Sequence, residues 1–257
     1  MKFHEFGDKN NKSILLIHGG GNAWWNYLRQ AKALCKDYHV ILPTLDGHGE
    51  EYNEKYISTN DSAKKLIEYI DKNCNGHLFL LCGVSLGGQI VIEMLSLRKD
   101  ITQKAIIDGS ICYPQPVMEK ICIATVHCLG GIMFGKSACK LQMLLLRMSK
   151  KMRFTKEIEN YYIKDMPLVK KSTLCSMYHT YMGEYTIRND ISKTNAQIMY
   201  WYGSKEMKCV KKSAQLLKEL VPSCKIYEAK GYNHGYLAVY LPDEWLNIVK
   251  NFLNDYK

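Results

Sequence analysis

Where an apolar run gives way to a helical pattern, the chain reads Gly83-Val84-Ser85-Leu86-Gly87-Gly88. The pattern Gly-x-Ser-x-Gly between a strand and a helix is typical of a nucleophile elbow. A serine at so sharp a turn needs a strained backbone, and side chains two residues before and after it would collide. The turn would lift the Ser85 hydroxyl above the sheet edge, where the helix directs its free N–H groups. The sequence therefore predicts a nucleophilic serine rather than an ordinary glycine-rich turn.

Short apolar runs alternate with longer helical patterns on both sides of this turn. We expect strands at 13–17, 39–42, 77–82, 104–107, 197–202 and 225–228, the second of them stopped by Pro43. Helices are expected at 24–35, 62–74, 86–97, 210–220 and 243–253. This alternation indicates βαβ units, hence an α/β fold with a mostly parallel sheet and helices on both faces. The carboxyl ends of parallel strands then share one edge, where sites gather.

The strand pattern disappears between residues 111 and 195. We predict a helical cap insertion there, and a core formed by residues 1–110 and 196–257. The insertion holds 13 Lys or Arg against 6 Asp or Glu. Flexible methionine suits an adaptable apolar pocket, whereas Met at helical spacing ordinarily belongs to a core. On the first interpretation the pocket would take an acyl or other apolar substrate, and its methionines would be Met118, Met133, Met143, Met148 and Met152.

A second glycine-rich loop, His18-Gly19-Gly20-Gly21, closes the first strong strand. An acyl-transfer site needs two backbone N–H groups aimed at the developing oxyanion. One would come from Leu86 and the other from Gly20 or Gly21. The alternative is a phosphate-binding loop, but the lysine of a P-loop is missing. His18 is expected to hold the loop rather than to catalyse.

The general base is expected in the loop after the last strand, Gly231-Tyr232-Asn233-His234-Gly235. Its imidazole has a near-neutral pKa, which suits a proton shuttle to Ser85. The acid that orients His234 is expected to be Glu206, because it follows the neighbouring strand. Asp108, at the end of another strand, is the alternative acid. Alternatively, Glu206 is a solvated carboxylate near a helix N-terminus, which is an ordinary role.

Composition excludes several other classes of protein. The net charge is +10, yet no basic arm or nucleic-acid-binding signature is present, so attraction to anionic surfaces or substrates is the remaining interpretation. The ten cysteines are scattered without a Cys-x-x-Cys pair, which indicates reduced, mostly buried thiols and no zinc site. The N-terminus lacks an apolar leader, and residues 121–135 form an apolar run too short to span a bilayer. We therefore expect a cytoplasmic protein without a transmembrane segment.

With these motifs in place, the chain resembles the α/β-hydrolase superfamily in its capped, single-domain branch. The resemblance covers residues 13–110 and 196–254, and the segment Leu45-Asp46-Gly47-His48-Gly49-Glu50 resembles a further loop of that branch. It implies a Ser–His–acid triad, a structural role for His48, and a cap between the fourth and fifth expected strands. The expected mechanism needs no metal or cofactor. Glu206 departs from the commoner aspartate.

The leading hypothesis is a serine hydrolase that cleaves a carboxylic ester or thioester of a small apolar or acyl substrate through an acyl-enzyme on Ser85. A lyase or C–C hydrolase on the same triad, or a non-enzymatic ligand receptor of this fold, are the alternatives. The sequence gives no oligomeric state.

Overall fold

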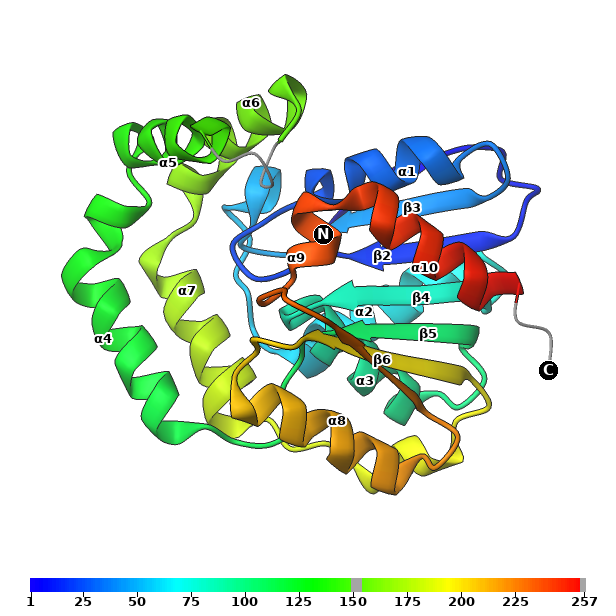
Figure 1. Cartoon of the computed structure of the whole chain (residues 1–257). Helices are drawn as coiled ribbons and strands as arrows, with labels where there is room; N and C mark the ends of the chain where they lie inside the picture. Colours follow the sequence, from blue (N-terminus) through cyan, green and yellow to red (C-terminus); the bar gives the residue numbers. More distant parts are fainter. Residues whose placement is uncertain (149–153, 255–257) are drawn as a thin grey trace.

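The computed structural model describes residues 1–148 and 154–254, so Met152 lies outside the described residues. Seven strands form one sheet in the order β1-β3-β2-β4-β5-β6-β7 (Figure 1). β1 pairs antiparallel with β3, and every other neighbouring pair is parallel. The strands are β1 Lys2–Phe6, β2 Ser13–Ile17, β3 His39–Thr44, β4 Leu78–Val84, β5 Thr102–Asp108, β6 Gln197–Gly203 and β7 Lys225–Ala229. The predicted mostly parallel sheet is confirmed.

Helices cover both faces of the sheet, as the near-continuous apolar strands require. One face packs against α1 Leu28–Leu34, α9 Tyr236–Tyr240 and α10 Pro242–Asn254. The other packs against α2 Thr59–Asn73, α3 Leu86–Leu97 and α8 Lys208–Leu220. Figure 1 shows these two layers with the sheet between them. The carboxyl ends of the parallel strands face the segment between β5 and β6.

Two details of the sheet differ from expectation. β3 continues through Pro43 to Thr44, although proline was expected to stop it. Its parallel pairing with β2 ends at Ile41, so beyond that point only β1 lies beside it, and the missing N–H is tolerated as on an edge strand. The polar segment Lys2–Phe6 was not expected to be a strand, but it forms the antiparallel edge strand β1.

Within 111–195, the described residues form helices and turns and no strand (Figure 1). They are α4 Pro116–Met133, α5 Lys136–Met148, α6 Lys156–Asp165, η3 Met166–Leu168, α7 Lys171–Tyr178, the π-helical η4 His179–Glu184, and η5 Asn189–Lys193. α4 packs along α7 and η4, and α7 lies between α4 and the sheet. By length and composition α4 could also cross a membrane, with a mean hydropathy of 1.3 and 11% of its residues buried. The division into core and cap remains a prediction.

Candidate active site

Ser85 lies in the sharp turn between β4 and α3. Its backbone has φ 55 and ψ −115, so the predicted strained conformation is confirmed. A Cβ on Gly83 would lie 2.3 Å from the Gly87 carbonyl, and a Cβ on Gly87 would lie 2.3 Å from the Ile17 carbonyl oxygen. Real Cβ atoms do not approach backbone so closely, which explains why the turn needs glycine at both positions.

Hydrogen bonds from β5 hold this turn in place. The Ser85 N–H donates to the carbonyl oxygen of Asp108 at 2.7 Å. The Ser110 hydroxyl donates to the carbonyl oxygen of Ser85 at 2.6 Å. Strain at Ser85 persists because both backbone groups of the residue are bonded to a neighbouring strand end.

A cavity of about 500 Å³ opens above Ser85 at the carboxyl ends of the strands. Its wall includes Gly20, Ser85, Leu86 and His234, which come from three separate parts of the chain. A larger cavity, about 760 Å³, lies at the opposite ends of the strands beside Lys104 and contains none of these four residues. The cavity above Ser85 has the size and apolar character of a small-molecule site.

His234 and Glu206 form a hydrogen-bonded pair beside this cavity. Nδ1 of His234 lies 2.6 Å from Oε1 of Glu206. The Glu206 side chain is 1% exposed, whereas the His234 side chain is 41% exposed and faces the cavity. Desolvation lowers the pKa of His234, but the hydrogen bond and the charge of Glu206 outweigh it, and the pKa is raised above its usual value. Nδ1 is the ring nitrogen that this pair uses, and Nε2 takes no part in it.

The loops that carry this pair are bonded to each other. The Lys205 N–H donates to the carbonyl oxygen of Tyr232 at 3.0 Å, and the Gly231 N–H donates to the Ser204 hydroxyl at 2.8 Å. Because β6 and β7 are neighbours, their following loops leave the sheet side by side. This adjacency brings residues 206 and 234 together.

Asp108, the alternative acid, is buried directly beneath the pair. No hydrogen bond joins it to His234, and its Oδ2 has no hydrogen-bond partner. Desolvation raises the pKa of Asp108 to about 7; the Trp201 indole and the charge of His234 oppose the rise, and Glu206 adds to it. Below that pH it is a neutral acid, so the geometry favours Glu206 as the partner of His234.

Gly109 forms the floor under the pair. It has φ +63, and a Cβ there would lie 3.0 Å from Oε1 of Glu206 and 3.1 Å from Nδ1 of His234. The absence of a side chain therefore lets the imidazole and carboxylate take these positions. Nothing in the sequence distinguished Gly109 from other glycines.

Both predicted oxyanion loops reach the cavity, but only one of the two candidate glycines lines it. Gly20 and Leu86 line it, whereas Gly21 is not among the residues of its wall and lies beside Met166. Leu86 is the first residue of α3, so its N–H has no partner within the helix. Gly20 is therefore the better placed of the two glycines to supply the second donor.

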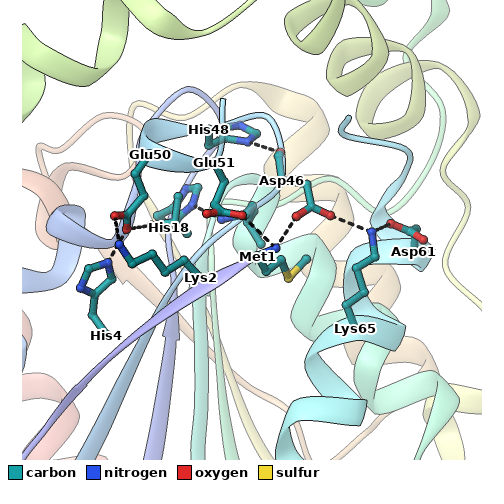
Figure 2. Close-up of polar contacts among 12 residues, drawn as sticks. Met1, Lys2, His4, His18, Asp46, His48, Glu50, Glu51, Asp61 and Lys65 are labelled. Carbon is teal, nitrogen blue, oxygen red and sulfur yellow. Dashed lines mark hydrogen bonds and ion pairs between the residues drawn. The ribbon is translucent and has the colours of Figure 1, made fainter. Parts of the chain in front are cut away.

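Two further histidines, His18 and His48, lie near each other beside these loops (Figure 2). Nε2 of His18 accepts a hydrogen bond from the Leu45 N–H at 3.1 Å, and its Nδ1 lies 2.8 Å from the Gly19 carbonyl oxygen. Nδ1 of His48 lies 2.9 Å from the carbonyl oxygen of Asp46. Burial lowers the pKa of His18 to about 3 and that of His48 to about 4. Both are neutral, fully buried and bonded to backbone, as expected of structural residues.

Methionines do line the cavity, but most are not the expected ones. Of the four expected Met residues that the structure describes, only Met118 contributes to the wall. Met133 and Met148 are exposed, and Met143 is buried within α5. The other methionines of the wall are Met177, Met182 and Met207. Composition indicated an adaptable apolar pocket, but helical spacing alone could not tell which face of each helix would turn toward it.

Tyr181 was missed by sequence reasoning and lies over Ser85. It belongs to the π-helical segment η4, is buried, and lines the cavity. Burial raises the pKa of Tyr181 above its usual value, and a hydrogen bond with Ser85 opposes this rise only in part. Its backbone carbonyl accepts a hydrogen bond from Gln89 Nε2 at 3.0 Å, which ties this segment to α3. No motif marked Tyr181, because its position depends on how the helices between β5 and β6 fold back.

The cysteines form no disulfide and belong to no cluster of metal ligands among the described residues. All ten cysteines are unpaired, and six are buried, as expected of reduced thiols. In residues 1–148 and 154–254, no group of three or more His, Cys, Asp and Glu side chains could hold a metal ion.

Comparison with known proteins places these features in context. A family model described as serine aminopeptidase, S33, matches residues 8–238. An AB hydrolase superfamily protein of Gibberella zeae is 28% identical over 113 residues, which span 42% of this chain and 38% of that protein. Among solved structures, a crystal structure from a study of Nitrososphaera gargenis carboxylesterases matches with a TM-score of 0.78 at 16% identity. The match covers 98% of this chain and 93% of the other. A carboxylesterase of Bacillus subtilis gives 0.74 at 16% identity, covering 99% and 88%. At such identities the structural likeness shows a shared fold.

Proposed function

Because the chain belongs to the serine aminopeptidase S33 family of α/β-hydrolases, we propose that it is a serine hydrolase acting on a carboxylic ester with an apolar acyl group. One observation carries the proposal. A nucleophile, an imidazole with its carboxylate partner and two backbone N–H positions border a single apolar cavity of about 500 Å³.

The proposed reaction has two halves, acylation and deacylation of Ser85, and His234 acts first as base and then as acid in each. His234 takes the proton of Ser85, and Ser85 Oγ attacks the ester carbonyl carbon. The N–H groups of Gly20 and Leu86 stabilise the oxyanion. His234 then protonates the leaving alcohol, and the acyl group remains on Ser85. Water, deprotonated by His234, releases the acid and restores the serine. Glu206 keeps the imidazole oriented and stabilises its charged form.

The character of the cavity favours an ester over a peptide with a free amino terminus. An aminopeptidase has to hold the substrate ammonium group, which calls for a carboxylate or a similar acceptor. Among the described residues, the wall of this cavity contains no Asp or Glu, and its polar side chains include those of Ser85, Tyr178, Tyr181 and His234. Glu206 is already engaged behind His234.

The first test is a series of p-nitrophenyl esters of increasing acyl length, with an aminoacyl p-nitroanilide as the competing substrate. Each methylene buried in the cavity contributes about 0.8 kcal/mol, so kcat/KM should rise about fourfold per methylene until the cavity is filled. A strong preference for acetyl over octanoyl esters, or faster cleavage of the anilide, would contradict the proposed substrate class.

The second test concerns the nucleophile. Ser85→Ala should lower kcat by about 10⁴-fold or more, as removal of a triad serine does, with little change in melting temperature. A fluorophosphonate probe should label the wild-type protein and not the variant. Retained turnover in the variant would refute the mechanism. Labelling without turnover of any ester would instead favour a lyase or a receptor.

A further inference from the structure

The outward faces of α4 and α5 carry most of the exposed apolar side chains of this protein. Among the described residues, nine of the twelve large apolar side chains that are exposed belong to these two helices. We call these faces the cap surface and represent it by six members: Val117 and Ile132 of α4, and Leu141, Leu144, Leu145 and Met148 of α5, with exposures from 54% to 77%. Exposed apolar patches of this kind mark interaction sites.

The spacing shows that these side chains form stripes rather than scattered contacts. On α5, residues 141, 144, 145 and 148 recur at helical intervals on one face, while Cys139 and Met143 point inward and are buried. Figure 1 shows α4 as the outermost helix, with α7 between it and the sheet. Both helices therefore turn an apolar stripe away from the rest of the protein.

The charged residues of α4 and α5 are mostly cationic. The two helices carry Lys120, Lys136, Lys140 and Arg147 against the single carboxylate of Glu119. Lys136 and Lys140 of α5 are exposed beside the apolar stripe. Glu119 is paired with His179 at 2.6 Å, and Arg147 is paired with Glu159 of α6, so Lys136 and Lys140 carry the exposed charge of α5. A helix with apolar and cationic exposed residues is typical of binding in the plane of an anionic bilayer.

This charge pattern argues against a second copy of the chain as the occupant. A symmetric dimer through these faces would place two such cationic stretches against each other, and like charges in contact oppose association. A membrane-spanning α4 is also unsuitable. Met118 and Cys122 of α4 form part of the cavity wall above Ser85, so removing the helix would open the cavity.

We propose that the cap surface binds peripherally to an anionic lipid bilayer, with its apolar side chains in the headgroup region and Lys136 and Lys140 at the phosphates. The inner side of α4 lines the cavity. In the bound protein its outer side would lie against the lipid, so α4 would separate the cavity from the bilayer. Binding itself does not depend on the proposed esterase activity, so the two proposals can fail separately.

The test is cosedimentation of the full chain with vesicles of phosphatidylcholine and of equal parts phosphatidylcholine and phosphatidylglycerol, at low and high salt. We expect binding to the anionic vesicles, weakened by salt, and little binding to phosphatidylcholine alone. Ser85→Ala should bind as the wild type does. Absent binding to the anionic vesicles, or equal binding to both compositions, would overturn the proposal.

Variants separate the apolar from the ionic contribution. The triple variant L141Q/L144Q/L145Q should bind about 100-fold more weakly, since three exposed leucines no longer enter the bilayer. K136Q/K140Q should bind at least about tenfold more weakly, because two cationic side chains no longer meet the lipid phosphates. The matched controls are Ile57→Gln, an exposed apolar residue elsewhere, and K36Q/K230Q. Equal loss in the controls would overturn the proposal, as would a concentration-dependent dimer that the triple variant abolishes while vesicle binding stays absent.

Discussion

The contact between His234 and Glu206 determines how the candidate site should respond to pH. The pKa of His234 is raised, and the imidazole acts as a base only when neutral. Activity should therefore appear as pH rises through that raised pKa. Glu206→Gln removes the charge that raises it, so the acid limb of kcat/KM should move to lower pH, while kcat falls by about 10⁴-fold. The pH profile of p-nitrophenyl ester hydrolysis measures both.

Asp108→Asn is the matched control for that experiment. It likewise replaces a carboxyl group near His234 with the corresponding amide, and we expect a much smaller loss of kcat. If Asp108→Asn abolished activity and Glu206→Gln did not, the acid would be Asp108.

Asp108 itself should make the free energy of unfolding depend on pH. Its pKa is about 7 in the folded protein, against 3.8 as the ordinary value. Between these values the folded state holds a proton that the unfolded state has lost, so stability falls as pH rises from about 4 to 7, by up to about 4 kcal/mol. Asp108→Asn removes this term. Urea unfolding should show the variant gaining stability relative to wild type as pH rises, and a constant difference would contradict the assigned pKa.

Gly109 offers a test of the geometry beneath the pair. In Gly109→Ala, the new Cβ would press on Glu206 and His234, and an alanine would have to adopt φ +63. We expect kcat to fall by about 10- to 100-fold, as small displacements of catalytic groups do, with a stability loss of about 1 kcal/mol. Activity measurement with thermal unfolding distinguishes the two effects. A loss in stability without a loss in kcat would mean that the backbone at residue 109 shifts and leaves Glu206 and His234 in place.

The helix that follows Ser85 also organises the segment above it. Gln89 of α3 donates from Nε2 to the carbonyl oxygens of Ile111 and Tyr181, both at 3.0 Å, and accepts from the Thr59 hydroxyl at 2.7 Å. Gln89→Met keeps the volume and leaves buried polar groups without partners. We expect a loss of about 2–4 kcal/mol in urea unfolding, together with a higher KM as Tyr181 moves. Gln89→Glu would be a poor control because it adds a buried charge.

How far these elements were predictable depends on whether local pattern or long-range packing decides them. β2 and α3 have the predicted bounds, because an apolar run and a helical period are local signals. β1 was missed because its half-buried, polar sequence forms a strand only through pairing with β3. The motifs located Ser85, Glu206 and His234 at strand ends, where topology then brings them together. Tyr181 and Gly109 carry no motif, since their roles follow from contacts between distant segments.

The helices between β5 and β6 are attached to the rest of the protein on two sides of the cavity. One attachment is the Gln89 network described above. On the other side, the Trp25 indole N–H donates to Oδ2 of Asp165 at 2.8 Å, beside an apolar cluster that includes Leu28 and Ile158. Met166, the next residue, lies beside Gly21 of the glycine loop. This arrangement links the position of the cavity roof to that of the proposed oxyanion loop.

The Trp25–Asp165 contact should therefore affect both stability and substrate binding. Both side chains are at most 5% exposed, so Trp25→Phe leaves a buried carboxylate without its donor. We expect a loss of about 2–4 kcal/mol in urea unfolding and a higher KM for long-chain esters, because the roof is less firmly held. Asp165→Asn retains an acceptor oxygen for the indole and should leave KM close to that of the wild type. A double-mutant cycle with Asp165→Ala would isolate the pair, with an expected coupling of about 1–3 kcal/mol. If Trp25→Phe lowered stability but left KM unchanged, this attachment would not control the roof, and the cavity would depend on the Gln89 side alone.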